Sequence, residues 1–159
     1  MAAWFQDVWL VASEEFSDLA NVRDFTRAGV RMFVAAALGA VLGHERERKG
    51  KPAGLRTHML VALGSALFVI VPAQSDMELE EISRVLQGVI SGIGFLGAGA
   101  IIKLAQDREI HGLTTAASIW ITASIGIAAG MGREMTAFLG TVVALFVLTV
   151  LQRLERNDE

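Results

Sequence analysis

The sequence predicts an all-α membrane protein, a polytopic bundle of about five transmembrane helices that follows an amphipathic N-terminal helix. Hydrophobic residues make up 53% of the 159 residues, and the mean hydropathy is positive at +0.48. Soluble domains are only about 45–50% apolar even with glycine included. Several uncharged runs approach the roughly 20 residues that a helix needs to cross a bilayer. These runs are continuous rather than alternating, which favours helices over the strands of a membrane barrel.

The first 27 residues form the predicted N-terminal segment. Acidic residues and the lack of a basic start argue against a signal peptide. Apolar side chains recur at intervals of three and four, as on one face of a helix. This stripe predicts a helix lying on the outer membrane surface, and packing against a partner subunit is the alternative. The stripe consists of Phe5, Val8, Trp9, Ala12, Phe16, Leu19 and Val22.

Residues 28–152 form the predicted transmembrane domain, and residues 153–159 form a short tail. The first span, 28–44, requires Arg31 to extend its side chain to the near interface. Loops and tail on one side of the membrane carry nine lysines and arginines, against four on the other side. Because basic loops stay in the cytoplasm, we expect the N-terminus outside and the C-terminus inside. The other four spans are expected at 57–75, 85–102, 110–132 and 135–152.

Composition also limits the chemistry. The chain has no cysteine, which excludes disulfides, thiolate metal sites and cysteine nucleophiles. Its net charge of -3 and pI near 5.6 argue against nucleic acid as a partner. No nucleophile, base and orienting residue occur at a recognisable spacing. We therefore predict neither an enzyme nor a metal or cofactor site.

Glycines are the most conspicuous feature of the spans. A G-x-G-x-x-G pattern at 92–97 lacks the acidic residue that a dinucleotide site needs about 20 positions later. Three G-x-x-x-G pairs instead favour close helix packing in lipid. The alternative is that the glycines at 88–99 interrupt the third span and expose carbonyls to an ion or a lipid headgroup. The predicted packing glycines are Gly39, Gly43, Gly88, Gly92, Gly94, Gly97, Gly99, Gly126 and Gly130.

Polar residues inside the spans allow two interpretations. Thr115, Ser118 and Thr122 fall on one side of the fourth span. Their hydroxyls either bond to carbonyls one turn back or line a path, which Gln87 and Ser91 could share.

The charged loop at 44–58 contains two acidic and five basic side chains flanked by histidines. It is either a simple anchor to anionic lipid or it has a specific role, in which its charges form a fixed ion-pair cluster at the ends of the first two spans or contact a cytosolic partner.

Four segments together resemble the MgtC/SapB family of bacterial inner-membrane proteins: GHERE at 43–47, PAGLRTH at 52–58, SGIGFLGAG at 91–99 and GLTTAASIW at 112–120. The resemblance implies a multi-helix membrane domain linked to survival in low magnesium and inside host cells. It also implies a regulator that contacts the membrane part of the F-type ATP synthase. The motif residues that it marks as possible binding residues are Glu45, Arg46, Arg56, Thr57, His58, Ser91, Thr114, Thr115, Ser118 and Trp120.

The chain departs from the MgtC-proper branch of that family. That branch has Asn at the positions of His58 and Thr114, Arg at the position of His111, and Cys just after the position of Trp120. It also carries a soluble C-terminal domain. These differences favour the shorter SapB-like branch.

Taken together, residues and resemblance predict a non-enzymatic inner-membrane protein that acts in magnesium or energy homeostasis. We expect it to contact lipid and to associate through its glycine faces, either with itself, a dimer being favoured, or with another membrane protein. The alternative is a small transporter or channel for Mg²⁺ or another solute, with a path along the third and fourth spans.

Overall fold

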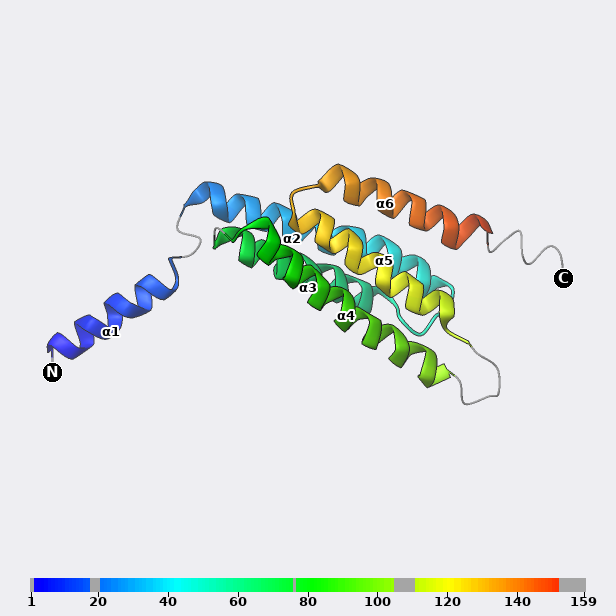
Figure 1. The fold of residues 1–159 in the computed structure, drawn as a ribbon, viewed down its shortest axis with the longest axis horizontal. Coiled ribbons are helices and arrows are strands. Elements are labelled where there is room, and N and C mark those ends of the chain that lie inside the picture. Colours follow the sequence, from blue (N-terminus) through cyan, green and yellow to red (C-terminus); the bar gives the residue numbers. More distant parts are fainter. Residues whose placement is uncertain (1, 18–20, 76, 105–110, 152–159) are drawn as a thin grey trace. The chain divides into compact units, whose positions relative to one another are not determined.

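The computed structural model describes residues 2–17, 21–75, 77–104 and 111–151, and all regular secondary structure in these ranges is helical (Figure 1). The chain divides into two compact units, 1–30 and 31–159. In chain order the helices are α1 (Ala2–Glu15), α2 (Val22–Arg48), α3 (Leu55–Gln74), α4 (Leu79–Leu104), α5 (Leu113–Gly130), α6 (Glu134–Phe146) and the π-helical η2 (Val147–Leu151).

The N-terminal stripe does not lie on one helix. α1 ends at Glu15, and Val22 is already the first residue of α2. Leu19 lies outside the described residues. α1 leaves the side chains of Trp4, Phe5 and Trp9 more than half exposed, so it has an apolar surface of the kind expected for a membrane interface. Its attachment to a membrane or to a partner stays a prediction.

Four helices, α2 to α5, are long and apolar enough to cross a membrane. The fifth expected span forms α6 and η2, and its apolar part, Glu134–Val150, is shorter than the other four. The crossing of this segment, and with it the orientation of the two termini, stays a prediction. Large apolar side chains on the helix surfaces, such as Phe33, Phe95 and Phe138, are more than half exposed, as expected where lipid is the solvent.

Helix α5 is the centre of the bundle. It contacts α3, α4 and α6, and it lies between α6 and the α3–α4 pair (Figure 1). A Cβ added to Gly126 would lie 2.8 Å from Cα of Ala62, and one added to Gly130 would lie 2.9 Å from Cα of Ala66. The α3 and α5 backbones therefore approach each other as closely as small residues allow.

Two glycines make α5 shorter than the uncharged run at 110–132. Gly112 precedes the helix with φ = 92°, and Gly132 follows it with φ = 72°. Left-handed backbone of this kind costs glycine little. After the helix, the N–H groups of Gly132 and Arg133 donate to the carbonyls of Ala129 and Ala128, which closes the last turn.

The interpretation in which glycines interrupt the third span is wrong. α4 runs without a break from Leu79 to Leu104 and includes all of 88–99. It also begins six residues before the expected span, in an acidic stretch. Glu80 and Glu81 occupy its first turn, where carboxylates are favoured by the helix dipole, and Arg84 pairs with Glu80 at 3.0 Å.

Candidate functional site at the charged end of the bundle

The connection between α2 and α3 is held by its own side chains. Oε2 of Glu47 accepts the N–H of Leu55 at 2.8 Å and so caps the first turn of α3. Backbone bonds from Gly50 to Glu47 and from Lys51 to Arg46, both 3.0 Å, close the end of α2. Gly50 adopts φ = 64°, a conformation that glycine tolerates. Close to this connection, a Cβ added to Gly43 would lie 2.7 Å from Cα of Leu55.

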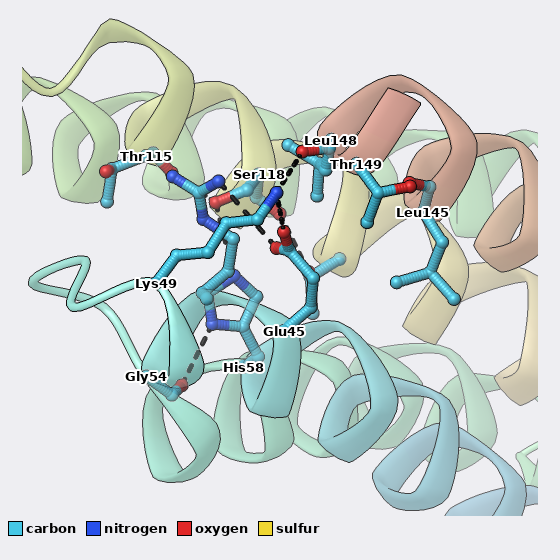
Figure 2. A network of polar contacts seen from close by, with 11 residues as sticks. Glu45, Lys49, Gly54, His58, Thr115, Ser118, Leu145, Leu148 and Thr149 are labelled. Atoms are coloured by element: carbon cyan, nitrogen blue, oxygen red, sulfur yellow. Dashed lines mark hydrogen bonds and ion pairs between the residues drawn. The ribbon is translucent and has the colours of Figure 1, made fainter. Parts of the chain in front are cut away.

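His58 joins α3 to α5 inside the bundle. Its side chain is fully buried. Nδ1 lies 2.9 Å from the carbonyl oxygen of Gly54, and Nε2 lies 3.2 Å from Oγ of Ser118 (Figure 2). A carbonyl can only accept, so Nδ1 carries a proton and donates it. The ring was expected to flank the loop at the interface, but it forms part of the helix-packing core.

The polar side of α5 is buried in the bundle at this contact. Thr115, Ser118 and Thr122 are at most 2% exposed. The Ser118 hydroxyl lies 2.7 Å from the Thr115 carbonyl, and the Thr122 hydroxyl lies 2.7 Å from the Ser118 carbonyl. The expected bonds to carbonyls one turn back are therefore confirmed for Ser118 and Thr122. Gln87 and Ser91, which could have shared an interior path, are exposed on α4.

A charged cluster lies beside this core, formed by Glu45, Arg46 and Lys49. Nζ of Lys49 lies 2.5 Å from Oε1 of Glu45 and also donates to the carbonyl of Leu148 in η2 at 2.6 Å (Figure 2). Nη1 of Arg46 lies 3.8 Å from Oε2 of Glu45. Three of the charged side chains of the loop thus form an ion-pair cluster, and its Lys49 ties the end of α2 to the C-terminal end of the bundle. Anchoring of the loop to lipid and its contact with a cytosolic partner stay predictions.

The structure brings together half of the candidate binding residues. Glu45, Arg46, His58, Thr115 and Ser118 form the charged cluster and the polar core beside it. The other candidates take no part in these contacts. Thr57 is half-buried near the start of α3, and four more are exposed: Arg56, Ser91, Thr114 and Trp120.

The predicted packing glycines fall into two groups. Gly39, Gly43, Gly126 and Gly130 face neighbouring backbone so closely that an added Cβ would overlap it. Gly97 has an ordinary contact with Ala116, 3.6 Å from an added Cβ to its Cβ. Gly88, Gly92, Gly94 and Gly99 have no described atom within 4 Å of an added Cβ, so a packing role for them stays a prediction about contacts beyond this chain.

Lys49 and Glu47 were missed as individual site residues. Glu45 and Lys49 are four positions apart, the spacing of a helical ion pair, so this pair could have been predicted. The role of Glu47 could not, because its carboxylate accepts from a backbone N–H that lies beyond a turn in the chain.

Residues 32–157 match the MgtC family model. The chain belongs to the MgtC family. It is 43% identical over 144 residues to Protein SrpB of Synechococcus elongatus, covering 84% of this chain and 79% of SrpB. It is 42% identical over 132 residues to the Escherichia coli protein named "Putative magnesium transporter YhiD", covering 79% of this chain and 60% of YhiD. Protein MgtC of Salmonella typhimurium is 37% identical over 116 residues, covering 73% of this chain and 48% of MgtC.

None of the solved structures matches the chain. Membership of the MgtC family and the four long apolar helices make this MgtC-family chain a membrane protein. It spans about half to four fifths of the length of these relatives.

Proposed function

We propose that this protein is a non-enzymatic accessory or regulatory protein of the bacterial inner membrane that supports magnesium or energy homeostasis through contacts with other membrane proteins. Its N-terminus would face outside and its C-terminus the cytoplasm. Family membership supports the link to magnesium, because a relative carries the name of a magnesium transporter. Contact with a partner such as the F-type ATP synthase, or with a second copy, belongs to this proposal.

One observation carries the choice of regulator over transporter. The polar residues that a path along α5 would use are buried against α3, with Ser118 bonded to His58 and Thr122 completely covered. Gly126 and Gly130 hold the two helices at backbone contact on the same interface. Polar groups that serve a path face a cavity in the bundle, whereas these groups are used in packing.

The space between α3 and α4 also supports this choice. A groove of about 490 Å³ lies there, and its walls include Leu60, Phe68, Val85 and Ile93. Such an apolar wall offers no polar ligands to a hydrated cation, whereas an acyl chain or an apolar helix can pack against it.

The experiment compares transport with physiological activity in the same protein. The purified protein is reconstituted into vesicles that contain a magnesium-sensitive dye, and the gene is tested for growth in low magnesium in a bacterial host that lacks its own MgtC-family gene. We expect restored growth together with magnesium entry no faster than in protein-free vesicles.

A matched pair of variants separates the two functions. Ser118→Ala removes a hydroxyl from the buried side of α5, and Ser124→Ala removes one that also bonds one turn back, to Trp120, but is not buried. Magnesium entry that is lost in Ser118→Ala and kept in Ser124→Ala would establish the transporter and refute the regulator.

A further inference from the structure

We propose that the cavity beside Arg46 binds a phosphate-class oxyanion, either free phosphate or the phosphate of an anionic lipid headgroup. This inference goes beyond the proposed function and does not depend on it. The cavity has a volume of about 500 Å³ and lies where the α2–α3 connection meets the first turn of α5. Its walls include Arg46, Lys51, His111, Gly112, Thr114 and Thr115.

The first argument is the guanidinium of Arg46. The side chain is 1% exposed, and its Nε and Nη2 have no hydrogen-bond partner among the described residues. Glu45 lies 3.8 Å from the other nitrogen, Nη1, which is too far for a hydrogen bond. Buried donors of this kind are costly unless a partner satisfies them. Nε and Nη2 share one edge of the guanidinium, and this fork matches two oxygens of a phosphate or carboxylate.

The second argument is the start of α5, which reaches the same cavity. Gly112 precedes the helix without a side-chain cap, and the first backbone bond of the helix runs from Ala116 to Gly112 at 2.8 Å. The N–H groups of the first turn, from Leu113 to Thr115, have no acceptor within a helix. Together with the positive end of the helix dipole, such N–H groups form a ready anion site.

The charges around the cavity favour an anion over a divalent cation. Glu45 is the acid of the charged cluster, and Lys49 lies 2.5 Å from it. Arg46 and Lys51 then remain as two cationic side chains on the wall. The hydroxyls of Thr114 and Thr115 are further donors. An oxyanion would find two kinds of donors, a buried guanidinium and a helix N-terminus, on facing elements.

The test uses variants outside the packed core, because Arg46 is too buried for its replacement to be interpreted alone. Thr114→Asp places a carboxylate in the exposed first turn of α5, where it supports the helix and repels an incoming anion. Lys51→Gln removes one charge from the wall. Arg84→Gln, on exposed α4, removes a positive charge from an ion pair elsewhere and is the matched control.

The first measurement is thermal unfolding of the full chain in detergent, with inorganic phosphate added at constant ionic strength. We expect saturable stabilisation of the parent. The apparent Kd should rise about tenfold in Thr114→Asp, in line with the loss of one hydrogen bond to a charged group, and about threefold in Lys51→Gln, in line with the loss of one partly exposed charge. Arg84→Gln should bind phosphate like the parent. If Thr114→Asp lowers the unfolding temperature even without ligand, the test is the comparison of the phosphate Kd of Lys51→Gln with that of Arg84→Gln.

The second measurement distinguishes the two sources of the phosphate group. The protein is reconstituted in nanodiscs of phosphatidylglycerol or of phosphatidylcholine, and retained lipid is counted by native mass spectrometry. Phosphatidylglycerol retained by the parent and Arg84→Gln, and lost from Thr114→Asp, identifies the headgroup, whereas stabilisation by free phosphate alone identifies the soluble anion. The proposal is overturned if neither ligand has a saturable effect, or if the cavity variants bind like Arg84→Gln.

Discussion

Replacing Gly126 by alanine should lower the free energy of unfolding by about 2 kcal/mol, although alanine is the better helix former. The new Cβ would lie 2.8 Å from Cα of Ala62 and 2.9 Å from its carbonyl carbon. Both are backbone atoms, so no side-chain rotation relieves the overlap, and α3 and α5 must move apart. Overpacking costs about 1–3 kcal/mol, and a backbone obstacle places this site near the upper value. The helix propensity of alanine offsets about 1 kcal/mol of it.

Gly92 provides the matched control on α4. An added Cβ there has no described atom within 4 Å, so Gly92→Ala should raise the free energy of unfolding by about 0.5–1 kcal/mol through helix propensity. Unfolding is followed by tryptophan fluorescence as sodium dodecyl sulfate is added to mild-detergent micelles. If Gly126→Ala and Gly92→Ala unfold at the same dodecyl sulfate fraction, close packing of α3 on α5 is refuted as the reason why position 126 requires glycine.

Three further predictions concern the charged end of the bundle. Glu47→Ala should lose about 1 kcal/mol of stability by uncapping α3, whereas Glu47→Gln keeps an acceptor and should lose less; equal losses would contradict the cap. His58→Ala and Ser118→Ala should each destabilise the chain, by about 3 and about 1 kcal/mol, and a double-mutant cycle should show a coupling of about 1 kcal/mol; additive losses would mean that their contact contributes nothing. Lys49→Met removes the donor to a carbonyl of η2, so hydrogen exchange of the η2 amides should become faster while that of α5 stays unchanged.

The positions of the helices could be predicted from the sequence, but their ends could not. Apolar runs locate the bundle because a membrane imposes a minimum length on each span. α2 begins at Val22 and α4 at Leu79, each six residues before the expected span. At the start of α2 the side chain of Asn21 accepts the N–H of Arg23, as helix-capping residues do, and at the start of α4 the carboxylates of Glu80 and Glu81 suit the helix dipole. α5 begins late and ends early relative to the uncharged run, because Gly112 before it and Gly132 after it adopt left-handed backbone, which a count of uncharged residues does not detect.

The charged cluster could be predicted in part, and the buried histidine could not. Glu45 and Lys49 lie four positions apart on one helix, so their pairing follows from helical geometry. His58 follows a run of charged residues, and this context suggests a surface position. Its burial depends on Ser118, 60 positions later in the chain, and on the close approach of α3 to α5. Contacts of that kind arise from packing and have no local signature.

The glycine pairs show that the G-x-x-x-G pattern alone does not decide whether a pair packs against another helix of the same chain. Gly126 and Gly130 oppose Ala62 and Ala66, which have the same spacing of four on α3, so two small surfaces meet and the backbones can touch. Gly88 and Gly92 have the same spacing, yet no described residue faces either of them closely. A glycine pair therefore indicates close packing within a chain only where another helix faces it at backbone distance. Helix α3 does so at Gly126 and Gly130 with Ala62 and Ala66, and at Gly39 and Gly43 with the backbone of His58 and Leu55. Where no described helix does so, as for the pair on α4, the pair leaves room for a partner from outside, and a contact of the proposed regulator is best sought there.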